Sequence, residues 1–95
     1  MTSLSSVIVA FDVDGTLLDE NDQPRWDVRD VLVAMSGWCT VVVWSGSGMD
    51  YAAMQGRRLF LPDTVLYREK VHGLADICFD DEDVNLATIS IRVIP

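Results

Sequence analysis

The sequence predicts an α/β fold in which a small, mostly parallel sheet packs in layers with helices. Short apolar runs alternate along the chain with segments of helical periodicity, an order typical of parallel sheets. Residues 7–11 (VIVAF) are apolar at every position, as in a strand that is buried on both faces. Aspartate or serine follows directly after three of the runs, and ligands bind such sheets at the carboxyl ends of the strands. The fold class therefore also predicts where a functional site lies.

The first half of the chain has the pattern strand, helix, strand, helix. Pro24 can begin a helix, and apolar residues recur at helical spacing over positions 26–35 until Gly37 stops the pattern. Residues 39–44 (CTVVVW) predict a second buried strand, and residues 49–59 predict a second helix.

The second half is expected to contain strands alone, at residues 64–67, 75–79 and 88–94. The last of these alternates Ile and Val with polar residues, which is the period of a half-covered edge strand. Only nine residues separate Lys70 from Asp80, and the part of them next to Lys70 (VHGLA, 71–75) allows about one helical turn. Because the predicted sheet is small, we expect a homodimer in which two subunits complete the core along residues 88–94.

Composition indicates one globular domain, residues 1–95, and narrows the possible functions. Hydrophobic residues make up 49% of the chain, and the formal net charge is −8. Such an acidic surface argues against a general nucleic-acid binder and against binding to anionic membranes, since both rely on clustered Lys and Arg. No apolar run reaches membrane-spanning length, and the N-terminus lacks the pattern of a secretory signal. We therefore expect a cytoplasmic protein with no membrane partner.

The cysteines and tryptophans are interpreted as structural residues. Cys39 and Cys78 both lie within apolar runs, which favours two buried free thiols over a disulfide or a metal pair. Trp26, Trp38 and Trp44 are expected in the core, with Trp44 adjoining the predicted site.

Two aspartates stand one residue apart at the end of the first strand, and this is the strongest chemical signal in the sequence. Asp12 and Asp14 repel each other, and burying such charges is unfavourable unless they are paired or bind a metal. One carboxylate can attack phosphorus to form an aspartyl-phosphate, while the other acts as general acid and base. Mg²⁺ held by these hard oxygen ligands would relieve the repulsion, and Gly15 permits the sharp turn of the backbone.

Residues 12–17 (DVDGTL) match the DxDGT(L) signature of the haloacid dehalogenase-like (HAD) hydrolases, a superfamily made up largely of Mg²⁺-dependent phosphatases. Three later segments resemble the family's other motifs in the expected order: VVVWSG, the single lysine of the chain, and ICFDD. The resemblance spans residues 7–81 and implies a Rossmann-like three-layer sandwich. It also implies hydrolysis of a phosphomonoester.

The resemblance assigns a role to each matched residue. Asp12 would be the nucleophile and Asp14 the general acid/base, while Ser45 and Gly46 would bind the phosphoryl group. Lys70 would neutralise that group and the nucleophile.

The Mg²⁺ ligands implied by the same motifs are Asp12, Asp80 and Asp81, together with the backbone carbonyl of Asp14. There are 33 positions from Asp12 to Ser45 and 25 from Ser45 to Lys70, too few for the cap domain of larger members. A capless site would admit bulky phosphoesters, including a nucleotide or the terminal phosphate of a nucleic acid. In this layout the chain is similar to the 3′-phosphatase domain of bacteriophage polynucleotide kinases.

Several alternatives compete with this interpretation. An EF-hand loop starting at Asp12 would need Gly and Glu where the chain has Leu17 and Gln23, which argues against calcium binding. The acidic run at residues 80–83 is, taken alone, more often a solvated surface segment. A non-catalytic phosphoacceptor resembling a response-regulator receiver, or an inactive protein that binds phosphate and Mg²⁺, remains the alternative function.

Overall fold

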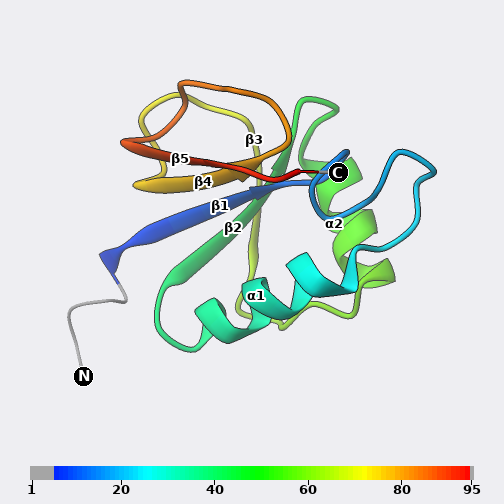
Figure 1. The fold of residues 1–95 in the computed structure, drawn as a ribbon. Helices are drawn as coiled ribbons and strands as arrows, with labels where there is room; N and C mark the ends of the chain where they lie inside the picture. The colour runs from blue at the N-terminus through cyan, green and yellow to red at the C-terminus, as the bar shows by residue number, and fades with distance from the viewer. Residues whose placement is uncertain (1–5, 95) are drawn as a thin grey trace.

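The computed structural model describes residues 6–94 and confirms an α/β fold. Five parallel strands form one sheet in the order β3-β2-β1-β4-β5 (Figure 1). In chain order the elements are β1 (Ile8–Asp12), α1 (Trp26–Ser36), β2 (Thr40–Ser45), α2 (Met49–Arg58), β3 (Leu66–Glu69), β4 (Ile77–Asp80) and β5 (Ile89–Arg92). Among the described residues, no helix has the length and apolar character needed to cross a membrane.

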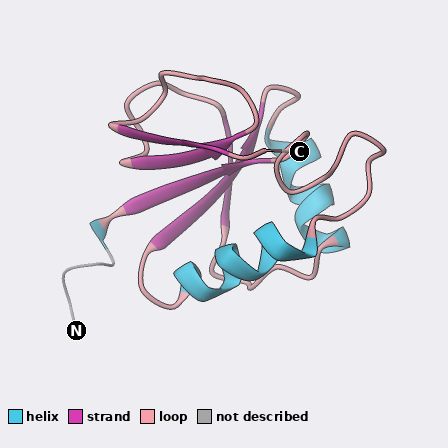
Figure 2. Ribbon diagram, viewed as in Figure 1, coloured by secondary structure: helices cyan, strands magenta, loops and turns pink. Residues whose placement is uncertain are grey.

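Both helices cover the same face of the sheet (Figure 2). The chain steps from β1 to β2 to β3 in one direction, and right-handed crossovers then place α1 and α2 on one side. Alternate residues of the strands point toward the helices and form the larger core. This core contains Val9, Phe11, Val13, Val41 and Val43 together with Val28, Leu32, Ala52 and Leu59.

Loops rather than helices cover the opposite face. The β3–β4 connection (residues 70–76) and the β4–β5 connection (residues 81–88) lie over it and form a smaller core with Ala10, Val42, Trp44 and Cys78. The structure is thus a sandwich whose third layer is irregular. The reason is the length of the connections, because neither is long enough to hold a helix of several turns.

Each predicted element is present, with its ends shifted by no more than three residues. The prediction for the last strand was wrong in one respect: β5 is exposed at all four positions, because no helix covers it. Trp26 and Trp38 were also wrongly placed in the core, since they are 51% and 53% exposed at the two ends of α1. Trp44 is fully buried as predicted.

The described cysteines match the predicted thiol state. Both are free, although only Cys78 is fully buried and Cys39 is half-buried.

Candidate active site

The candidate site lies where the direction of chain progress across the sheet reverses. β1 is the central strand, with β2 on one side and β4 on the other, so the carboxyl ends of β1 and β4 meet at a topological switch point. Phe11 and Phe79 pair in register and their rings stack with centroids 4.5 Å apart. The next residue on each strand is an aspartate: Asp12 is 5% exposed and Asp80 is 2% exposed.

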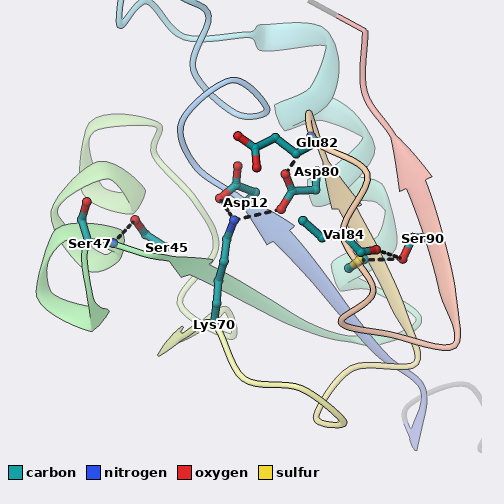
Figure 3. A network of polar contacts seen from close by, with 9 residues as sticks. Asp12, Ser45, Ser47, Lys70, Asp80, Glu82, Val84 and Ser90 are labelled. Atoms are coloured by element: carbon teal, nitrogen blue, oxygen red, sulfur yellow. Dashed lines mark hydrogen bonds and ion pairs between the residues drawn. The ribbon is translucent and has the colours of Figure 1, made fainter.

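Lys70 joins these two buried aspartates. It follows directly after β3, and its Nζ lies 2.9 Å from Asp12 Oδ1 and 2.9 Å from Asp80 Oδ2 (Figure 3). A buried carboxylate is strongly unfavourable without such a partner. The structure therefore brings together two predicted metal ligands and the predicted phosphate-binding lysine.

Burial raises the pKa of Asp12 to about 7. The hydrogen bond and the charge of Lys70 oppose this rise, while the charge of Asp80 adds to it. Burial by itself lowers the pKa of Lys70, but its hydrogen bonds to the two aspartates outweigh this effect and the pKa is raised. Lys70 therefore stays protonated at neutral pH, whereas Asp12 binds a proton more readily than an exposed aspartate.

Asp81 adds a third carboxylate. One oxygen from each of Asp12, Asp80 and Asp81 lies within 4.8 Å of the other two. Gly15 makes room for this arrangement: a Cβ at that position would overlap the Asp81 carboxylate, and the backbone has a φ of +82°, which disfavours residues with a side chain.

These three carboxylates fit a magnesium ion. Mg²⁺ prefers hard oxygen ligands at about 2.0–2.1 Å, and carboxylates this close can reach one ion with small side-chain movements. Three carboxylates and one ammonium also leave an excess of negative charge, which a divalent cation would neutralise.

Two hydrogen bonds fix the segment that carries Asp80 and Asp81, one to the Asp80 carboxylate and one to the Asp81 backbone. The amide of Glu82 donates to Asp80 Oδ1 over 3.0 Å, which leaves the other oxygen of Asp80 for Lys70. Arg92 Nε donates to the carbonyl of Asp81. Sequence reasoning missed these contacts, because they depend on how the 81–88 loop folds back over the sheet.

Asp14 lies outside this acidic group. Its side chain is exposed and accepts a 2.6 Å hydrogen bond from the Tyr51 hydroxyl, in the first turn of α2. That hydrogen bond raises the pKa of Tyr51 to about 12. The sequence did not single out Tyr51, although its place just after the SGSG segment puts it at the same edge of the sheet.

The predicted phosphate-binding Ser45 is at the end of β2 and is almost fully buried. Its Oγ accepts a hydrogen bond from the amide of Ser47, so the serine side chain is oriented by its own turn (Figure 3). Gly46 is exposed and has open space around it. Within residues 6–94 no hydrogen bond links Ser45 to the aspartates or to Lys70.

Two buried polar atoms near the site have no hydrogen-bond partner in the described chain: Thr16 Oγ1 and Trp44 Nε1. Thr16 follows Gly15 in the first motif, and Trp44 pairs in register with Asp12. Leaving such a group unpaired costs about 1–3 kcal/mol.

Comparison of the chain with protein-family models, with curated proteins and with solved structures gave no match. The interpretation of the site therefore depends on its own geometry.

Proposed function

We propose that the protein is a Mg²⁺-dependent phosphatase of the HAD type, which hydrolyses a phosphomonoester through an aspartyl-phosphate on Asp12. The supporting observation is that Lys70 contacts both Asp12 and Asp80 while Asp81 lies beside them. These residues come from three separate parts of the chain and meet at the edge of the sheet where ligands bind.

The reaction has two steps. Asp12 attacks phosphorus, the ester P–O bond breaks, and the leaving oxygen takes a proton from Asp14. Water then attacks the aspartyl-phosphate, Asp14 accepts its proton, and inorganic phosphate leaves with Asp12 restored. Lys70 stabilises negative charge on Asp12 and on the phosphoryl oxygens. Mg²⁺ held by the three carboxylates would supply further positive charge to the transferring group.

Hydrolysis of an aryl phosphate with the Asp12→Asn variant tests this proposal. The amide is a far poorer nucleophile than the carboxylate, so we expect turnover to fall by about a thousandfold or more. The measurement is release of the coloured alcohol in the presence of Mg²⁺, and a chelator should abolish it in the wild type. Asp63→Asn, an exposed aspartate in the α2–β3 connection, is the matched control and should leave the rate unchanged. Wild-type turnover by Asp12→Asn would contradict the covalent mechanism.

One observation favours a second candidate, a phosphoacceptor that does not turn over. The Tyr51 hydroxyl holds Asp14 away from the acidic group, so the residue that would activate water is engaged elsewhere. The lifetime of the aspartyl-phosphate separates the two functions. A phosphatase releases phosphate promptly after reaction with a small acyl phosphate, whereas a phosphoacceptor yields a stable phosphoprotein that can be isolated.

A nucleotide or a terminal nucleic-acid phosphate is the proposed substrate class, on the ground that no segment of the described chain forms a cap over the site. The net charge of −8 disfavours long polyanions and so favours the smaller members of that class. We also propose a cytoplasmic location.

A further inference from the structure

The proposed function does not use the free edge of β5. β5 is the last strand of the sheet on the β4 side, and its four residues are all exposed. Natural sheets usually protect such an edge with charges, proline, a bulge or a covering segment. β5 has one charged residue, Arg92, and none of the other devices.

The backbone of β5 offers unused hydrogen-bonding groups on its outer side. The amides of Ile89 and Val93 donate to the carbonyls of Asp76 and Asp80, and so they point inward. Successive residues of a strand alternate in direction, so the amide and carbonyl groups of Ser90 and Arg92 point away from the sheet. Another extended strand is a protein partner that can pair with a row of such groups.

An apolar groove runs beside this edge on the helix face. It has a volume of about 230 Å³ between α1 and the last two strands, and it is lined by Asp27, Val28, Val31, Phe79, Ile91 and Val93. The Arg25 guanidinium donates to the carbonyl of Ile94 over 2.8 Å and ties the segment after β5 to the start of α1. A strand added to β5 would therefore extend the sheet and also close the open side of the groove.

We propose that the partner is a second copy of this chain, bound through antiparallel β5–β5 pairing about a two-fold axis at Ile91. The strand is complementary to itself in this register, since Ile91 faces its own copy, Ile89 faces Val93, and Ser90 faces Arg92. The Ile and Val side chains fall on the groove face, and no two like charges stand opposite each other.

Charge supports a second copy at this edge in particular. The protein carries a net charge of −8, so two copies repel each other over most of their surface. Residues 88–94 contain no acid and one arginine. By contrast, the opposite edge strand β3 exposes Arg68 and Glu69, which protect it against pairing. Because this pairing uses the β5 edge of both subunits, neither subunit keeps a free β5 edge and the assembly stops at a dimer.

Sedimentation velocity across micromolar concentrations tests the proposal. We expect wild-type protein to move from the 10.6 kDa monomer toward twice that mass as its concentration rises. Ile91→Lys places two ammonium groups opposite each other at the axis and should weaken the dimer at least about a hundredfold. Leu66→Lys, at a comparably exposed position on β3, is the matched control and should associate like the wild type (Leu66 is 50% exposed and Ile91 is 41% exposed).

Mixing variants separates a lost interface from a lost fold. Ile91→Lys and Ile91→Glu should each be monomeric and should form a mixed dimer when combined, because the two new charges then attract. Wild-type protein that stays monomeric, or Ile91→Lys protein that still dimerises, would overturn the proposal. So would two folded variants that do not associate with each other, or wild-type species larger than a dimer.

Discussion

The two halves of the sheet differ in how their strands are connected. β1, β2 and β3 are joined by helices that bury one face of the sheet, and β1 and β2 are buried at every position but the first. β4 and β5 are reached through loops, and β5 is exposed throughout. Helical connections therefore provide most of the core, while the loop connections leave an open edge and bring polar side chains across the end of the sheet.

The candidate site lies at the boundary between these halves. Asp12 belongs to the first half and Asp80 to the second, and Lys70 comes from the connection between them. The site therefore forms only when β4 pairs with β1. The three predictions below, from the largest expected effect to the smallest, test whether the halves depend on each other in this way.

Replacing Lys70 by methionine should have the largest effect on stability. The change leaves two buried carboxylates without their cation, and removal of one partner from a buried ion pair costs about 3–5 kcal/mol. Urea unfolding at neutral pH with chelator present measures the loss, and Mg²⁺ should restore part of it. Arg68→Met, two residues earlier and exposed, is the control. Equal unfolding free energies for the two variants would show that the ion pairs of Lys70 with Asp12 and Asp80 do not stabilise the pairing of the two halves.

A pair of leucine substitutions compares the helix layer with the loop layer. Leu32 of α1 is fully buried, so Leu32→Ala should cost about 3–4 kcal/mol of unfolding free energy through the cavity that it leaves. Leu86 in the 81–88 loop is only partly buried, and Leu86→Ala should cost about 1 kcal/mol. The measurement is again urea unfolding. If Leu86→Ala lowered the unfolding free energy as much as Leu32→Ala, the loop layer would contribute as much to stability as the helix layer.

A change of one pH unit at the boundary should have the smallest effect, at most about 1.4 kcal/mol of unfolding free energy. The pKa of Asp12 in the folded protein, about 7, lies above its ordinary value of 3.8, so the folded state holds a proton that the unfolded state releases. Without metal, Asp12 therefore lowers the stability progressively from about pH 4 to pH 7, and the full loss is present above pH 7. Mg²⁺ competes with this proton, so its affinity should rise by at most about tenfold per pH unit up to pH 7.

Calorimetric titration of Mg²⁺ at several pH values, together with unfolding in chelator, measures both effects. Asp12→Asn is the control, since the amide does not titrate and should remove most of the pH dependence in this range. An Mg²⁺ affinity that is constant between pH 5 and pH 7 would contradict the prediction.

Local patterns predicted the elements well and their exposure less well. Residues 39–44 are apolar at nearly every position, and such a run predicts a strand whatever its position in the sheet. The alternation at residues 88–94 predicted a strand correctly but a covered face wrongly, because cover depends on which connections hold helices. The prediction that Trp26 and Trp38 lie in the core was wrong for a similar reason. Trp26 begins α1 and Trp38 follows its end, and both side chains are about half exposed there.

The candidate site was predicted in its composition but not in its internal contacts. Asp12, Lys70, Asp80 and Asp81 were all named from strand ends and motif order, and the structure brings them together. The hydrogen bond from Tyr51 to Asp14 was not foreseen, because it joins residues 37 positions apart through the packing of α2. Whether these residues catalyse hydrolysis stays a prediction.

The sequence by itself determined the strands, the helices and the residues at the strand ends, because hydrophobic periodicity and turn residues act over a few positions. Only the tertiary structure decided which strands are neighbours, which face the helices cover and which carboxylates share Lys70. Those features depend on contacts between residues far apart in the chain. Such contacts stabilise the protein only after the strands have paired into one sheet.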